Sequence, residues 1–131
     1  NKEQMDELEA KTMYIQSFPK TFKGAIELLK KQNKVNNPML AEYLNMDDST
    51  FARSLSDPRC YTNPDYLTLL CLYFKLPDWL SRLVFKRANV QLDEDVKRNQ
   101  ALLHILRVQS NDGVDAANEF LARSNLEQLK I

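Results

Sequence analysis

The chain contains 131 residues, of which 44% are hydrophobic and 27% are charged, so one domain with a buried core is expected rather than a disordered tail. The 18 Lys and Arg balance the 18 Asp and Glu, which excludes a polybasic tail and a strong long-range attraction to nucleic acid. One His and two Cys exclude a multi-His zinc centre and a disulfide framework.

The composition favours helices. Glycine and proline number only two and five, and leucine outnumbers valine plus isoleucine by 20 to 10. Few turn residues disfavour hairpin-rich sheets, and the unbranched Cβ of Leu suits a helix. The sequence therefore predicts an all-α fold. In chain order we expect an arm or short helix before Pro19, followed by helices over about 22–31, 39–44, 48–56, 64–75, 77–88, 94–109 and 114–123.

Capping residues mark several of these boundaries. The hydroxyl of Thr21 can accept from a free N–H group of the first turn that follows it. Pro38 suits a first helical position, where its missing N–H is not needed. Asn45 can adopt the left-handed conformation that ends a helix, and Asp47 or Asp48 is the expected cap of the next one.

The segment 40–55 predicts two short helices joined by a tight turn. Ala41 lies where the two helix axes must approach closely, and its small side chain permits that approach. Leu44, Met46 and Phe51 can fill the angle between the helices. This pattern is typical of a helix-turn-helix, in which the second helix projects outward and can enter a major groove of DNA.

At these residues the chain resembles the phage-repressor-like, or Xre-type, helix-turn-helix family. That family reads Leu-Ala-x-x-Leu-Gly, an apolar residue, a short polar cap, Thr, an apolar residue, any residue and Arg. The matching positions here are Leu40, Ala41, Leu44, Met46, Thr50, Phe51 and Arg53, with Asn45 in place of the Gly. A proline-containing polar loop, the helix over 64–75 and the segment 76–80 extend the resemblance over about residues 20–89.

The resemblance implies an all-α architecture with a five-helix helix-turn-helix domain over residues 20–90. An arm or linker helix over 1–19 precedes it, and a two-helix extension over 91–131 follows, either as part of the same compact unit or as a dimerisation element. The implied function is sequence-specific binding of double-stranded DNA by a transcriptional regulator or by the DNA-binding part of a larger one. A homodimer is expected to bind paired half-sites.

The resemblance also implies which residues contact DNA. It places Asp48, Ser49 and Arg53 toward base edges, with Arg53 as the principal reader of guanine. Asn37, at the start of the first motif helix, is expected to reach a base or a phosphate. Hydroxyls, amides and helix N-termini bind phosphate, and the residues expected to contact the DNA backbone are Arg59, Tyr61, Thr62 and Asn63.

The charge of this segment supports an alternative function. Residues 45–63 hold three Asp against two Arg, and Asp47 and Asp48 open the expected recognition helix. A carboxylate that faces phosphate is unfavourable unless it caps the helix or accepts a hydrogen bond from cytosine. The alternative is a protein-interaction module that keeps the helix-turn-helix fold without DNA affinity.

No enzymatic activity, cofactor or metal is expected. The sequence has no Gly-rich phosphate loop, no nucleophile–His pair and no metal-ligand spacing. Its longest apolar stretch, 67–74, is far shorter than the about 20 residues that cross a membrane, and no signal peptide is recognisable. We therefore expect a cytoplasmic protein without a membrane partner, whose Cys60 and Cys71 are unpaired thiols.

Overall fold

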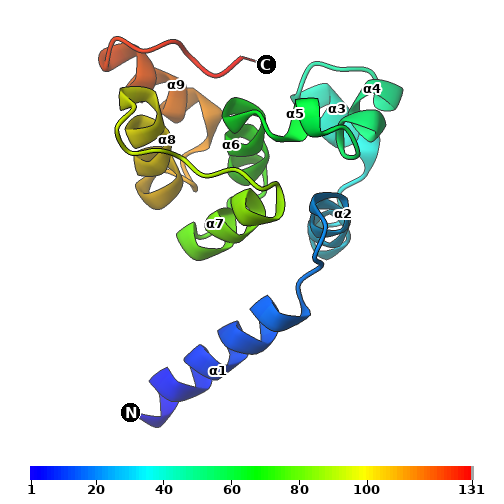
Figure 1. Cartoon of the computed structure of the whole chain (residues 1–131), viewed down its shortest axis with the longest axis vertical. Helices are drawn as coiled ribbons and strands as arrows, with labels where there is room; N and C mark the ends of the chain where they lie inside the picture. The colour runs from blue at the N-terminus through cyan, green and yellow to red at the C-terminus, as the bar shows by residue number, and fades with distance from the viewer. Residues whose placement is uncertain (131) are drawn as a thin grey trace.

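The computed structural model describes residues 1–130, which form α-helices and no strand, so the predicted all-α class is confirmed (Figure 1). No helix in this part of the chain is long and apolar enough to cross a membrane. In chain order the helices are α1 (Lys2–Ser17), α2 (Phe22–Asn33), α3 (Asn37–Tyr43), α4 (Asp48–Ser54), α5 (Pro58–Tyr61), α6 (Pro64–Tyr73), α7 (Asp78–Arg87), α8 (Lys97–Val108) and α9 (Gly113–Arg123).

Polar side chains fix the beginnings of several helices. Thr21 Oγ1 accepts a hydrogen bond of 3.0 Å from a backbone N–H of the first turn of α2, and Asn36 caps α3 in the same way. Asp47 caps α4 through a bond of 2.7 Å to the backbone N–H of Thr50. Each cap satisfies one of the N–H groups that a first turn leaves without a partner. Asn45 has a φ of 55°, the left-handed conformation predicted for it.

Two segments differ from the sequence-based expectation. Residues 2–17 form a regular helix of 16 residues, where we expected an arm or a short helix, and the capping box of Asn1 begins it. Residues 58–61 form one helical turn, where we expected a loop. Asp57 caps this turn by accepting the backbone N–H of Arg59 at 2.9 Å, and Pro58 takes the first helical position. The Asp57-Pro58 pair therefore ends one helix and also begins another.

Helix α6 lies at the centre of the fold. All seven residues from Tyr66 to Leu72 are buried, so α6 presents no polar face to solvent. It contacts α5, α7, α8 and α9, while α2 contacts α7 (Figure 1). The apolar faces of α8 and α9 are thereby covered within the same chain, and Leu102, Ile105 and Leu121 are completely buried. A helix that is apolar all round requires such a cover on every side.

An ion pair joins α8 to α6, and two polar contacts hold the chain after α9 against α8 and α9. Arg98 on α8 donates from Nε and Nη2 to the two carboxylate oxygens of Asp65 at 3.2 and 2.8 Å. Its Nη1 also donates to the carbonyl of Glu127 at 2.7 Å. Beyond α9, Asn118 Oδ1 accepts the backbone N–H of Leu129 at 2.6 Å, and the Leu129 side chain is buried. The chain after α9 is therefore part of the packed structure.

The packing of α3 against α4 gives a stability prediction. Ala41 is only 1% exposed and belongs to the same buried cluster as Phe51 of α4, which is completely buried. Ala41→Leu is expected to overpack this contact and to lower the free energy of unfolding by about 1–3 kcal/mol. Ala52→Leu on the exposed side of α4 is the matched control. Equal midpoints for the two variants in urea denaturation would contradict the tight contact.

Candidate nucleic-acid interface

The outward side of α4 is exposed to solvent and mostly polar. Asp48, Ser49, Ala52 and Arg53 are exposed, and their spacing along the chain places them on one side of the helix. The opposite side is buried and carries Phe51, which packs in the core. The short helix is therefore held by one face while the other is open to a partner.

A buried pair of hydroxyl groups anchors α4 to α6. Ser54 Oγ donates to the carbonyl of Phe51 at 2.6 Å and shares a second hydrogen bond of 2.6 Å with the hydroxyl of Tyr66. Because the single proton of Ser54 is used on the carbonyl, Tyr66 is the donor in the second bond. Burial raises the pKa of Tyr66 to about 12, so this donor stays protonated at neutral pH. We did not predict this contact, since the sequence marks Ser54 only as a polar residue late in a helix.

The two carboxylates that open α4 differ in their surroundings. Asp47 accepts the backbone N–H of Thr50 at 2.7 Å and the hydroxyl proton of Ser49 at 3.0 Å. These hydrogen bonds hold the pKa of Asp47 below its usual range. The charge of Asp47 is thus directed into its own helix, as predicted for a cap. The Asp47 carboxylate also engages the hydroxyl proton of Ser49. Asp48 is exposed and forms no ion pair within residues 1–130.

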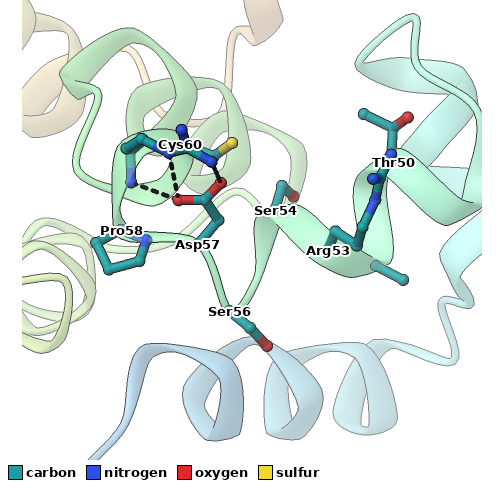
Figure 2. A pocket seen from close by; sticks show the side chains of 9 residues that line it. Thr50, Arg53, Ser54, Ser56, Asp57, Pro58 and Cys60 are labelled. Carbon is teal, nitrogen blue, oxygen red and sulfur yellow. Dashed lines mark hydrogen bonds and ion pairs between the residues drawn. The ribbon is translucent and has the colours of Figure 1, made fainter.

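A groove of about 770 Å³ lies beside α4 and α5 (Figure 2). Arg53 and Arg59 are the two predicted site residues that line it. The other lining residues were not predicted as part of a site, and they are Thr50, Ala52, Ser54, Ser56, Asp57, Pro58 and Cys60. Recognising the Asp57-Pro58 pair as a helix start would have revealed that the chain turns here and brings α5 beside α4.

The two arginines of the groove have different partners. Arg59 donates to Asp57 from Nε at 3.2 Å and from Nη2 at 3.0 Å. Figure 2 marks hydrogen bonds at the Asp57 carboxylate with dashed lines. These hydrogen bonds lower the pKa of Asp57 and raise that of Arg59. Arg53 has no carboxylate within ion-pair distance in the described residues. The unpaired positive charge of this groove therefore belongs to Arg53.

The remaining predicted residues lie outside the groove. Tyr61 stacks on Phe22, with ring centroids 4.7 Å apart, and Thr62 donates its hydroxyl to a carbonyl of α5. Asn63 caps α6 by accepting a backbone N–H at 2.9 Å. Asn37, at the start of α3, is half-buried, and its Oδ1 has no hydrogen-bond partner within the described chain. The side chains at 61–63 thus have structural partners, and the DNA contacts expected of them stay predictions.

The two cysteines are expected to differ in reactivity. Cys60 is half-buried and lines the open groove, whereas Cys71 is completely buried, and burial raises the pKa of its thiol to about 12. Thiolate is the reactive form, so Cys71 is expected to be inert in the folded chain. Titration with a chromogenic disulfide at pH 8 should modify one thiol in the native protein and two in denaturant. Modification of Cys71 in native Cys60→Ser protein at a similar rate would contradict this burial.

Comparisons of this chain with protein-family models, with curated proteins and with solved structures find no match.

Proposed function

We propose that α3 and α4 form a helix-turn-helix of the phage-repressor type and that α4 binds in the major groove of double-stranded DNA. The chain then acts as a cytoplasmic transcriptional regulator, or as the DNA-binding part of a larger one, and binds paired half-sites as a homodimer. The observation that carries the proposal is the outward side of α4, where the exposed guanidinium of Arg53 has no carboxylate of residues 1–130 within ion-pair distance.

The chemistry of this exposed side suits base edges in the major groove. A free guanidinium such as that of Arg53 can donate two hydrogen bonds to O6 and N7 of guanine. The methyl group of Ala52, one residue earlier, suits the methyl group of thymine. Asp48 can accept a hydrogen bond from N4 of cytosine, which is the one base-edge role that favours a carboxylate here. The contacts expected of Arg53 and Asp48 favour a DNA site that contains G·C pairs.

The charges near α4 predict weak binding to DNA of unrelated sequence. Arg59 is already paired with Asp57, and Asp48 repels phosphate, so few cations remain to neutralise the DNA backbone. Non-specific affinity depends on the number of phosphates that the protein neutralises. We therefore expect selectivity to come from base contacts more than from charge.

A titration of the chain against random-sequence duplex DNA tests the proposal most directly. At low ionic strength we expect measurable binding by fluorescence anisotropy, and the slope of log affinity against log salt should correspond to about 0.9 per phosphate contact. We expect a small slope of about −2 to −4, since few cations face the DNA. A chain that binds neither random duplexes nor any sequence enriched from them by selection does not act on DNA.

The alternative proposal, a protein-interaction module that keeps this fold, is favoured by one observation. The guanidinium of Arg59 forms a bidentate pair with Asp57. In a DNA-binding loop the same guanidinium would be directed at phosphate. The two proposals differ in the DNA titration, because an interaction module shows no salt-dependent affinity for any duplex. A pull-down that compares the unchanged chain with a groove variant such as Ala52→Arg would then show whether the groove beside α4 binds protein.

A single substitution tests the electrostatic part of the proposal. Asp48→Asn removes an exposed carboxylate from the side of α4 that is proposed to face DNA. Its affinity for random duplex DNA is expected to increase about threefold to tenfold at low salt, because one repulsion with phosphate is lost. Asp115→Asn, an equal charge change at an exposed position of α9, is the control. Equal gains in the two variants would show only a general charge effect.

A further inference from the structure

The first helix carries three large apolar side chains, set among polar ones, that the rest of the chain leaves uncovered. Met5, Leu8 and Met13 are 70%, 64% and 62% exposed, which makes them the most exposed large hydrophobic residues of the described chain. Figure 1 shows the reason, since α1 extends away from the other helices and meets them only toward its C-terminal end. All three residues line a single shallow groove along α1.

A few side-chain contacts join the base of α1 to the body of the molecule. Tyr14 packs edge-to-face on Trp79 of α7, with ring centroids 5.8 Å apart, and donates its hydroxyl to Gln32 of α2 at 3.1 Å. Just beyond the helix, Arg87 Nε donates to the carbonyl of Pro19 at 2.7 Å. These contacts lie at the C-terminal end of α1, and the side chains of Met5, Leu8 and Met13 are exposed to solvent. An isolated helix of this length is only marginally stable in water, and a partner that covers these side chains would stabilise it.

The charges of the N-terminal region are separated along the chain. Residues 1–10 contain Lys2 and four carboxylates, whereas residues 11–23 contain no carboxylate and three lysines, namely Lys11, Lys20 and Lys23. Lys11 Nζ lies over the Trp79 ring of its own chain, 5.1 Å from the ring centroid, and Lys20 and Lys23 lie just beyond the end of α1. Two copies of α1 that lie antiparallel bring the acidic half of each toward Lys20 and Lys23 of the other. A parallel pair would bring like charges together. The acidic half also disfavours DNA and anionic membranes as partners of α1.

We propose that α1 is a self-association surface, on which a second copy of the chain pairs its own α1 antiparallel and covers Met5, Leu8 and Met13. This names the contact of the homodimer in the proposed function, but it can be tested without DNA. The apolar faces of α8 and α9, the other expected dimer element, are covered by α6 and α7 of the same chain. A helix of 16 residues is about 24 Å long. One pair of such helices buries less surface than a standard interface, which buries about 800 Å² on each partner. We therefore expect a weak dimer.

Sedimentation of the full chain over a range of concentrations tests this surface. We expect a monomer–dimer equilibrium in the micromolar range, and the double variant Met5→Gln/Leu8→Gln should weaken it at least tenfold. Glutamine keeps the helix, the approximate size and the charge, so circular dichroism should show unchanged folding. Val108→Gln is the matched control, because Val108 is also exposed, at 58%, but lies at the end of α8. A chain that is still monomeric at about 1 mM, or equal weakening by Val108→Gln, overturns the proposal.

The antiparallel direction has its own test. Raising the ionic strength from about 50 mM to about 500 mM should weaken the dimer severalfold, because attraction between opposite charges is screened. Lys20→Glu/Lys23→Glu should weaken it at low salt, and mixing this variant with Glu3→Lys/Glu7→Lys should restore association between the two chains. A dimer that strengthens with salt, or two variants that do not associate with each other, rules out antiparallel pairing. DNA binding by a chain that stays monomeric would leave the proposed function standing while this inference fails.

Discussion

Removal of residues 93–131 is expected to unfold the whole chain rather than to release a folded helix-turn-helix. The deleted segment contains α8, α9 and the chain beyond them, whose buried residues cover α6. Without them the apolar surface of α6 between Tyr66 and Leu72 meets water on one side. The ion pair of Asp65 with Arg98 is lost as well.

The size of the buried surface sets the expected effect. Five large apolar side chains of the deleted segment are at most 4% exposed, and they are Leu102, Ile105, Leu106, Leu121 and Leu129. Full burial of one such side chain contributes about 1.5–3 kcal/mol, while a whole domain is stable by only about 5–15 kcal/mol. The truncated chain should therefore lose its cooperative thermal transition and most of its helical circular dichroism.

A point substitution tests the same packing of α8 on α6 without shortening the chain. Leu102→Ala is expected to lower the free energy of unfolding by about 2–5 kcal/mol, because Leu102 is completely buried. Val108→Ala, at an exposed position of the same helix, should change it by less than about 0.5 kcal/mol. A truncated chain that melts cooperatively, or equal effects of the two substitutions, would show that α8 and α9 are dispensable for the rest of the fold.

Local signals in the sequence were sufficient for most of the helix boundaries. The cap at Thr21, the cap at Asp47 and the left-handed Asn45 lie where their side-chain chemistry predicts them. These features depend on a few neighbouring residues, so they can be recognised without knowing what packs nearby. The all-helical class followed from composition for the same reason.

Features that depend on distant residues could not be predicted in this way. The hydroxyl pair of Ser54 and Tyr66 joins residues 12 positions apart, and Arg98 pairs with Asp65 across 33 positions. Nothing in the local pattern of either residue specifies such a partner. The length of α1 was also missed, because its apolar residues are covered only near its base and give no regular helical stripe. The candidate groove required α5, whose single turn has almost no periodicity to detect.

The second large effect is expected at Arg53 and concerns recognition of DNA rather than stability. Arg53 is exposed on α4 and has no ion pair within the described residues, so Arg53→Ala removes no internal contact of that kind. The thermal midpoint should therefore stay within about 2 °C of that of the unchanged chain, since exposed substitutions have small effects. A loss of binding would then reflect the interface alone.

For a duplex selected by the unchanged chain from a random pool, Arg53→Ala should lower affinity by about 1–3 kcal/mol, which is roughly 5-fold to 150-fold. Discrimination should disappear at one G·C position only, because a guanidinium contacts one guanine. Arg53→Lys keeps the charge without the fork of donors, so it should retain affinity for random duplexes but not the preference for that guanine. Arg123→Ala, an exposed arginine of α9, is the control for loss of charge. If Arg53→Ala and Arg123→Ala bind the selected duplex equally well, α4 does not read the base sequence.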